Sequence, residues 1–154
     1  MNCWDTSKIT DMSLAFLYQT EFDDPIECWD TSKVTTMARM FDKASAFNQS
    51  IDSWDVSQVK NMTRMFVYAN YFNQPVDSWD VSKVTAMVDM FARASTFNQS
   101  VSAWDTSKVT SMLGMFFNAV KFNQSIDSWS VSKVERMGYM FLTASSFNQC
   151  LSTW

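Results

Sequence analysis

The residues of this 154-residue chain that could do chemistry recur at one fixed spacing. Five aspartates stand 25 residues apart, each directly after a tryptophan: Asp5, Asp30, Asp55, Asp80 and Asp105. Carboxylates gathered on one surface could bind Ca²⁺ or another hard cation, which prefers oxygen ligands. They could instead face a ligand as an acidic strip, or accept hydrogen bonds from backbone amides in their own turns. We favour this last, local interpretation, because a lysine follows three residues later in most repeats and screens the charge: Lys8, Lys33, Lys83, Lys108 and Lys133.

The tryptophans themselves could form an outward aromatic strip for a sugar or a protein, or an inward stack. Trp29, Trp54, Trp79, Trp104 and Trp129 follow the same period. If they pointed outward, Val56 and Val81 would point outward with them, and aspartate and serine would be buried. Burying polar groups without partners is costly. The pattern therefore predicts a core stack.

A third periodic set is asparagine in a Phe-Asn-Gln triplet: Asn48, Asn73, Asn98, Asn123 and Asn148. Asparagine at a fixed bend can bond the backbone of its own coil and of the next one, which predicts an asparagine ladder. Glycosylation is the alternative, since three of the five begin Asn-Gln-Ser sequons. The asparagine persists where Pro75 and Cys150 alter that motif, which favours the ladder.

Cys3 and Cys28 occupy the same place in adjacent repeats. Stacked Cα atoms about 5 Å apart lie within the range that a disulfide can bridge, so we consider a Cys3–Cys28 bond feasible in an oxidising compartment. Cys150 lies in another part of its repeat, and we expect it to be free or intermolecular.

Several classes of function are excluded. The chain has no histidine, which removes Ser-His and Cys-His catalysis. Two glycines are too few for a phosphate-binding loop, and a net charge of −4 provides no basic surface for nucleic acid. No segment is long and apolar enough to span a membrane or to act as a signal peptide. We predict a protein that is not an enzyme, with no catalytic residues, no cofactor and no bound metal.

These residues are positioned by a repeat of 25 residues without insertion or deletion. Each repeat begins at a tryptophan, and positions are counted from it. The six repeats span 4–28, 29–53, 54–78, 79–103, 104–128 and 129–153, and Trp154 begins a seventh. A strict period of this length is typical of a solenoid, and we expect one array over residues 1–154.

Within a repeat, two apolar periods follow one another. Trp54 and Val56 alternate with Asp55, which favours a short strand. From Val59 to Phe72 the apolar residues recur at steps of three and four, which favours a helix, with Ser57 as its N-cap. The predicted fold is therefore a right-handed α/β solenoid of the leucine-rich-repeat kind, with a parallel sheet on one side and short helices on the other.

One whole repeat, from Trp29 through the Met-x-x-Met-Phe and Phe-Asn-Gln blocks to Ile51, closely resembles the repeat of BspA-like leucine-rich surface proteins. That repeat was first catalogued as a domain of unknown function in mycoplasma lipoproteins. The resemblance covers essentially the whole chain. It implies a cell-surface or secreted location, adhesion to host or matrix proteins in some members, and no catalytic residues.

Variation is concentrated at positions 8, 10, 11, 14, 15 and 18 of the repeat, on the predicted helix exterior and return loop. It includes Arg39, Arg64, Tyr68, Tyr71, Asp89, Phe117, Lys121 and Tyr139. We expect a non-catalytic module that binds protein or glycan at a cell surface or matrix through one face of the array. The alternative is a structural unit, because unpaired edge strands at both ends would allow copies to stack end to end into filaments or surface layers.

Overall fold

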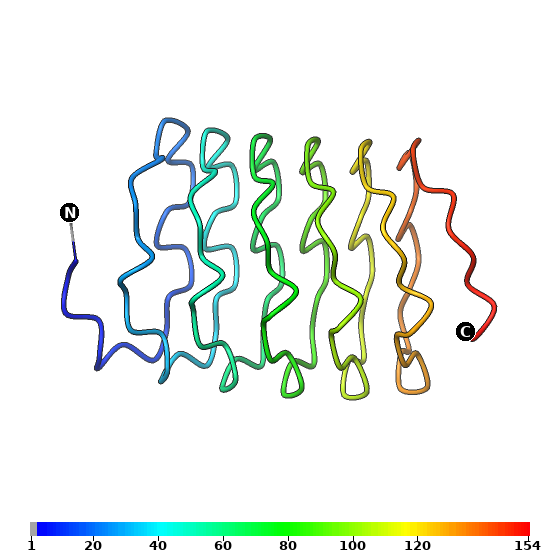
Figure 1. Ribbon diagram of the computed structural model, residues 1–154, viewed down its shortest axis with the longest axis horizontal. Coiled ribbons are helices and arrows are strands. Elements are labelled where there is room, and N and C mark those ends of the chain that lie inside the picture. Colours follow the sequence, from blue (N-terminus) through cyan, green and yellow to red (C-terminus); the bar gives the residue numbers. More distant parts are fainter. Residues whose placement is uncertain (1–2) are drawn as a thin grey trace.

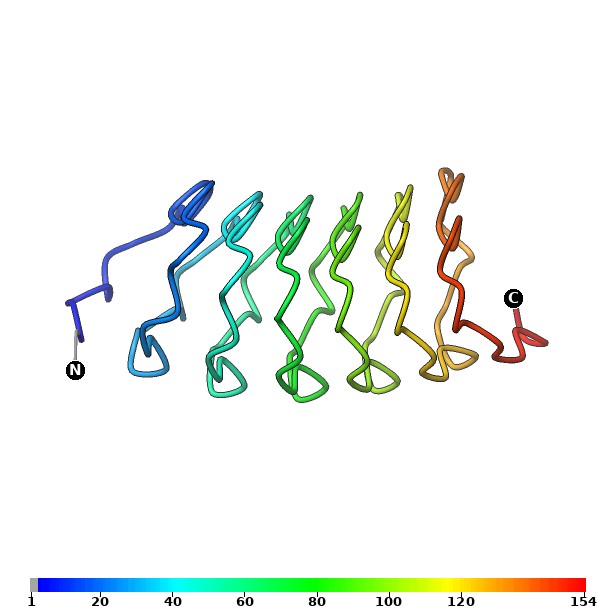
Figure 2. The ribbon, with the colours of Figure 1, turned by 90° about the horizontal axis from the view of Figure 1, so that it is seen from above.

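The backbone winds through six successive coils, each lying against the one before it, with the two chain ends at opposite ends of the row (Figure 1). The computed structural model describes residues 3–154. Seen from above, the coils keep the same outline and orientation along the whole row (Figure 2). We number them coil 1 to coil 6 by the repeats defined above.

The predicted helices and parallel sheet are absent. Residues 3–154 contain no helix and no strand, and therefore no helix that could cross a membrane. The only β-type pairing in that range is a set of isolated parallel bridges between single residues at position 8: Asp11, Thr36, Asn61, Ala86, Ser111 and Arg136. The prediction of an α/β solenoid of the leucine-rich-repeat kind is wrong.

The helix prediction fails because two residues of each coil have a positive φ angle. In coil 3, Arg64 and Tyr68 have φ angles of +60° and +57°, whereas an α-helix needs φ near −63° throughout. The same two positions, 11 and 15, have positive φ in every coil, as at Arg39, Lys43 and Asp89. The segment is therefore a series of tight turns, and there is no helix for Ser57 to cap.

Alternate amides in this segment bond to different partners. Met65 N–H and Ala69 N–H donate within the coil, three residues back, at 3.2 and 3.0 Å. Phe66 N–H instead donates to the Met90 carbonyl of the next coil at 2.9 Å. The spacing of three and four between apolar residues thus reflects turns that bring the chain back to the core. Hydrogen bonds between coils take the place of the hydrogen bonds within a helix.

The strand prediction fails for a related reason. Trp54 and Val56 are buried and Asp55 is exposed, so the alternation was interpreted correctly. However, Trp54 N–H and Val59 N–H both donate three residues back along the chain, to the Ile51 and Val56 carbonyls. A turn on either side leaves this segment without a backbone ladder to its neighbours among the described residues.

The core contains columns of aromatic rings in which each ring stacks on the same residue type of the next coil. Each of the four central phenylalanines at position 13 lies nearly parallel to its counterpart, as between Phe66 and Phe91, with centroids 5.4 Å apart and planes 4° apart. Phe91 also stacks on Phe97 of its own coil at 4.0 Å. Methionines at positions 9 and 12 fill the remaining interior and are fully buried in the central coils, as at Met62 and Met65.

Removing one ring from the middle of this stack should destabilise the fold strongly. Phe91→Ala should lower the free energy of unfolding by about 3–5 kcal/mol, because a large cavity replaces contacts with two coils. Urea unfolding followed by tryptophan fluorescence measures the change. Tyr71→Ala is the matched control, since Tyr71 is 66% exposed, and it should change stability by less than about 0.5 kcal/mol. Equal effects of the two substitutions would contradict this account of the core.

Candidate functional site

The tryptophans lie inside the array. Trp54, Trp79, Trp104 and Trp129 are buried, and each donates its indole N–H to a backbone carbonyl 28 residues earlier. Trp29 is 9% exposed and stacks between Trp4 and Trp54. Their rings are therefore occupied by packing and do not form an outward strip for a ligand.

The periodic aspartates make local turns. Each accepts a hydrogen bond from the backbone amide of the serine two residues later, as Asp105 does from Ser107 at 3.0 Å; the acceptors are Asp5, Asp30, Asp55, Asp80 and Asp105. The hydroxyl and amide of Ser107 lower the pKa of the Asp105 carboxyl. Residues 3–154 hold no cluster of three histidine, cysteine or acidic side chains that could bind a metal ion. The aspartates therefore bond the backbone within their own turns, as the local interpretation expects.

The five asparagines form a continuous chain of contacts between coils. The side-chain oxygen of each of Asn48, Asn73, Asn98 and Asn123 accepts the backbone amide of its counterpart 25 residues later, at 2.8–3.0 Å; the last donor is Asn148. Asp23 takes the same role in coil 1, accepting from Asn48 at 2.8 Å. A carboxylate therefore serves as well as an amide oxygen at this position.

That equivalence provides a test of the asparagine contacts. Asn98→Leu should lower stability by about 1 kcal/mol, because the Asn123 amide loses its acceptor. Asn98→Asp keeps an oxygen at the same place and should leave stability within about 0.5 kcal/mol of the original. Hydrogen exchange at the Asn123 amide reports the bond directly. Unchanged protection in the leucine variant would show that the side chain does not hold the coils together.

Cys3 and Cys28 form a disulfide, with their Cα atoms 5.7 Å apart. The bond links Cys28, the last residue of coil 1, to the residue that precedes that coil. Cys150 is free and exposed.

Three of the varied positions, 11, 14 and 15, lie together on one surface of successive coils, which we call the variable face. A row of alternating aromatic and cationic side chains runs along it. Lys43 Nζ lies 4.5 Å from the Tyr18 ring centre and 5.9 Å from that of Tyr68. The Arg93 guanidinium lies 4.9 Å from Tyr68 and 5.1 Å from Phe117. Each cation is thus shared between two rings.

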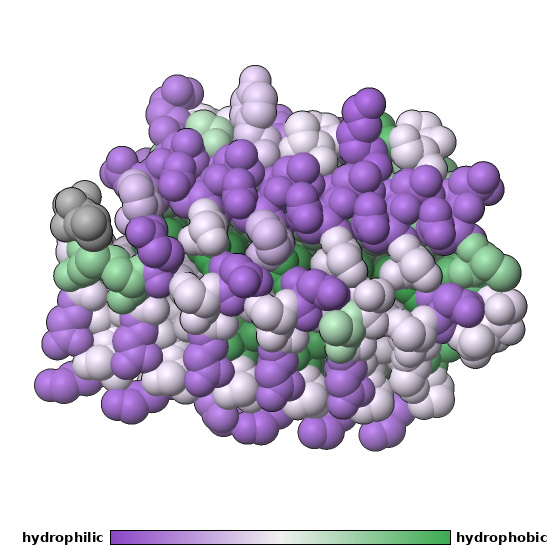
Figure 3. Space-filling model, in the orientation of Figure 1, coloured by the Kyte–Doolittle hydropathy of each residue, from purple (hydrophilic) through white to green (hydrophobic). Residues whose placement is uncertain are grey.

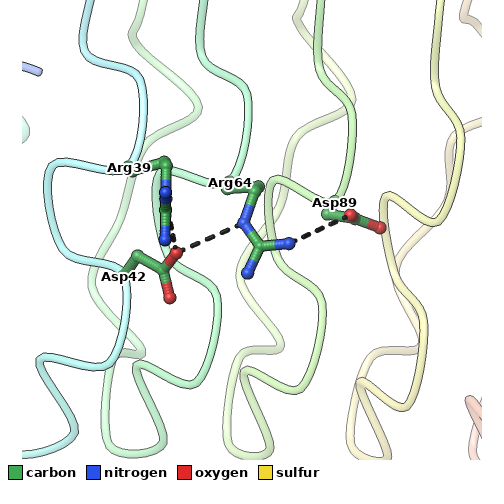
Figure 4. A network of polar contacts seen from close by, with 4 residues as sticks. All are labelled: Arg39, Asp42, Arg64 and Asp89. Atoms are coloured by element: carbon green, nitrogen blue, oxygen red, sulfur yellow. Dashed lines mark hydrogen bonds and ion pairs between the residues drawn. The ribbon is translucent and has the colours of Figure 1, made fainter. Parts of the chain in front are cut away.

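Beside this row runs a chain of ion pairs across three coils (Figure 4). The Nε atoms of Arg39 and Arg64 approach the same oxygen of Asp42, at 3.0 and 3.2 Å. Arg64 also reaches Asp89 at 3.8 Å. The Asp42 side chain is fully buried, and its other oxygen, Oδ1, has no hydrogen-bond partner among the described residues. Two arginines neutralise this one buried carboxylate.

A pocket of about 410 Å³ opens beyond Asp89, lined by Leu113, Gly114, Phe117, Tyr139 and Leu142. Burial raises the pKa of the Asp89 carboxyl, although Arg64 opposes the effect. Asp89 Oδ1 leans over Gly114, where a Cβ would lie only 2.1 Å from it. The pocket is therefore apolar on most sides with one carboxylate at its edge.

Sequence variation pointed to part of this face but missed other residues on it, including Tyr18, Lys43 and Arg93 of the aromatic and cationic row. Arg39, Arg64, Tyr68, Asp89, Phe117 and Tyr139 were named from their variability and lie together on the face or in its pockets. Tyr71 and Lys121 are exposed at position 18, away from the pairs described above. Asp42 and Gly114 were not singled out. Asp42 is the one acidic residue at position 14, and Gly114 is one of two glycines in the chain.

A search of curated proteins and a search of solved structures each found no match. A family model described as "Mycoplasma protein of unknown function, DUF285" matches residues 1–94 and again 74–154. The expected mycoplasma repeat type is thereby confirmed. The two matches together span the whole array, and the chain belongs to this family of mycoplasma-type repeat proteins.

Proposed function

We propose that the chain is a non-catalytic binding module at a cell surface, which recognises a protein partner through the variable face. The observation that carries this proposal is the row of aromatic and cationic side chains at positions that the fold leaves free to vary. The resemblance of the repeat to that of BspA-like surface proteins supports the proposed location and adhesive role.

The chemistry of the face favours a protein over a glycan. Tyrosine and arginine are the residue types that dominate binding energy at protein interfaces. Here Tyr18 and Tyr139 are 55% and 70% exposed, and the arginines are held in place by Asp42 and by stacking. A partner would meet side chains that are already ordered, which reduces the entropy cost of binding.

Binding to a panel of extracellular-matrix proteins and glycans, measured by biolayer interferometry, tests the proposal. We expect the chain to bind at least one protein of the panel. Replacing Tyr18, Tyr68 and Tyr139 together by serine should weaken that binding at least about tenfold, equivalent to about 1.4 kcal/mol.

The matched control changes an exposed residue of the constant part of the repeat. Lys108→Ala, at position 5, should leave affinity unchanged. Binding that is retained in the triple serine variant, or found only for glycans, would contradict recognition of a protein by the variable face. Absence of binding to every panel member would also count against it.

A second function, assembly end to end, is favoured by the direction of the inter-coil bonds. In coils 1 to 5, the amides at positions 9, 11, 13 and 15 donate to the following coil. In coil 6, the amides of Met137 and Phe141 have no acceptor among the described residues, and in coil 1 the Asp11 and Ala15 carbonyls have no described donor. Hydrophobic surface is also visible at both ends of the array in Figure 3. Donors at one end would match acceptors at the other, and such head-to-tail contacts form filaments.

Light scattering after size-exclusion chromatography over a hundredfold concentration range separates the two functions. End-to-end assembly predicts a mass that rises above 17.8 kDa with concentration, equally in Cys150→Ser and with reductant. A constant monomer mass would rule assembly out. A rise abolished by reductant and by Cys150→Ser would trace the larger species to a disulfide instead.

A further inference from the structure

Position 11 of coil 5, next to Asp89 on the variable face, is Gly114 and therefore has no side chain. Position 11 carries Arg39, Arg64 and Asp89 in coils 2 to 4, then Gly114, then Tyr139. Figure 4 shows one oxygen of Asp89 facing Arg64 and the other directed toward the next coil. Asp89 is therefore the end of an alternating chain of charges, with a cation on one side and glycine on the other.

The space over Gly114 is shaped for an elongated side chain with a polar head. Its volume of about 410 Å³ lies between the Asp89 carboxylate and the exposed Tyr139 ring. Leu113 and Leu142 provide apolar walls, and Leu142 is 49% exposed. A flexible aliphatic chain could lie along these walls with its head group at the carboxylate.

The Asp89 carboxylate at the edge of the pocket favours a cation there. The Asp89 side chain is 30% exposed, and its ion pair with Arg64 is long, at 3.8 Å. Burial without a close partner disfavours its charged form. Asp42, in contrast, has two arginine Nε atoms within 3.2 Å. A second cation beside Asp89 would complete the pattern that Asp42 already shows.

The chain itself demonstrates that this face accommodates such groups. Lys43 lies between Tyr18 and Tyr68, and Arg93 lies between Tyr68 and Phe117. A cation beside Asp89 and Tyr139 would extend the same arrangement of carboxylates, cations and rings by one more coil.

We infer that the pocket over Gly114 receives a lysine or arginine side chain of the partner protein, with its head group on Asp89 and its stem against Tyr139. The identity of the source, a protein, rests on the proposed function, whereas the preference for a cation rests on the pocket alone. Because Tyr139 and Leu142 are exposed at its rim, the pocket suits a side chain entering from a second surface.

The test is an NMR titration of the chain with capped tripeptides Gly-Lys-Gly and Gly-Arg-Gly. Gly114 and Gly138 are the two glycines, so the Gly114 amide is easily identified and reports the pocket. We expect saturable shifts at Gly114 with both cationic peptides. Affinity should be at least about tenfold weaker for Gly-norleucine-Gly, which has the stem without the charge, and Gly-Glu-Gly should produce no shift.

Asp89→Asn keeps the shape of the side chain and removes its charge, and it should weaken binding of both cationic peptides at least about tenfold. The matched control is Asp105→Asn, on an aspartate outside the pocket, which should leave affinity unchanged. Tyr139→Ala should reduce affinity about threefold or more through loss of the ring. Retained affinity in Asp89→Asn, or equal binding of the norleucine peptide, would overturn the inference.

A further titration with n-butylammonium separates a peptide side chain from a free amine. Tighter binding of n-butylammonium than of Gly-Lys-Gly would overturn the assignment to a partner protein. These results are independent of the panel experiment. Panel binding that depends on the tyrosines, together with no shift at Gly114, would leave the proposed function standing and remove this inference. Saturable peptide binding without any panel partner would contradict the proposed function, overturn the assignment to a partner protein and leave only the preference of the pocket for a cation.

Discussion

The hydrogen bonds that alternate amides donate to the following coil are the constraint on which the structure depends. An amide such as Phe66 N–H can bond four residues back, as in a helix, or to Met90 in the next coil, but not to both. Positive φ at Arg64 and Tyr68 turns the alternate amides outward along the stack. That conformation is unfavourable by about 1–2 kcal/mol for a residue with a side chain, and the inter-coil bonds offset it.

Stacking at this short and constant spacing determines which side chains can repeat. Phenylalanine rings lie face to face along the row, as Phe66 and Phe91 do, and asparagines bond the next backbone amide, as Asn73 does to Asn98. Like charges cannot stack on themselves without partners. Where Arg39 and Arg64 follow one another, the buried Asp42 lies against both.

This difference divides the chain into a constant frame and a variable face. Side chains that pack on their own counterparts are confined to one residue type, and they account for the tryptophans, phenylalanines, methionines and asparagines. Side chains at positions 11, 14 and 15 are limited only by their neighbours' charge and size. They can therefore diverge between coils without disturbing the core, which makes this face suitable for recognition.

The sequence alone determined the period, the limits of each coil and the residues that face inward, because burial repeats at every turn of the chain. It also indicated the contacts of Asn98 and the pairing of Cys3 with Cys28, since equal positions in adjacent coils must lie side by side. It could not exclude a helix, because a run of turns and a helix share apolar steps of three and four. The sign of φ at Arg64 is decided by an acceptor 24 residues away, and only the stacked coils bring that acceptor into reach. The ion pairs of Asp42 depend in the same way on side chains from two coils, and the pocket over Gly114 on side chains from three.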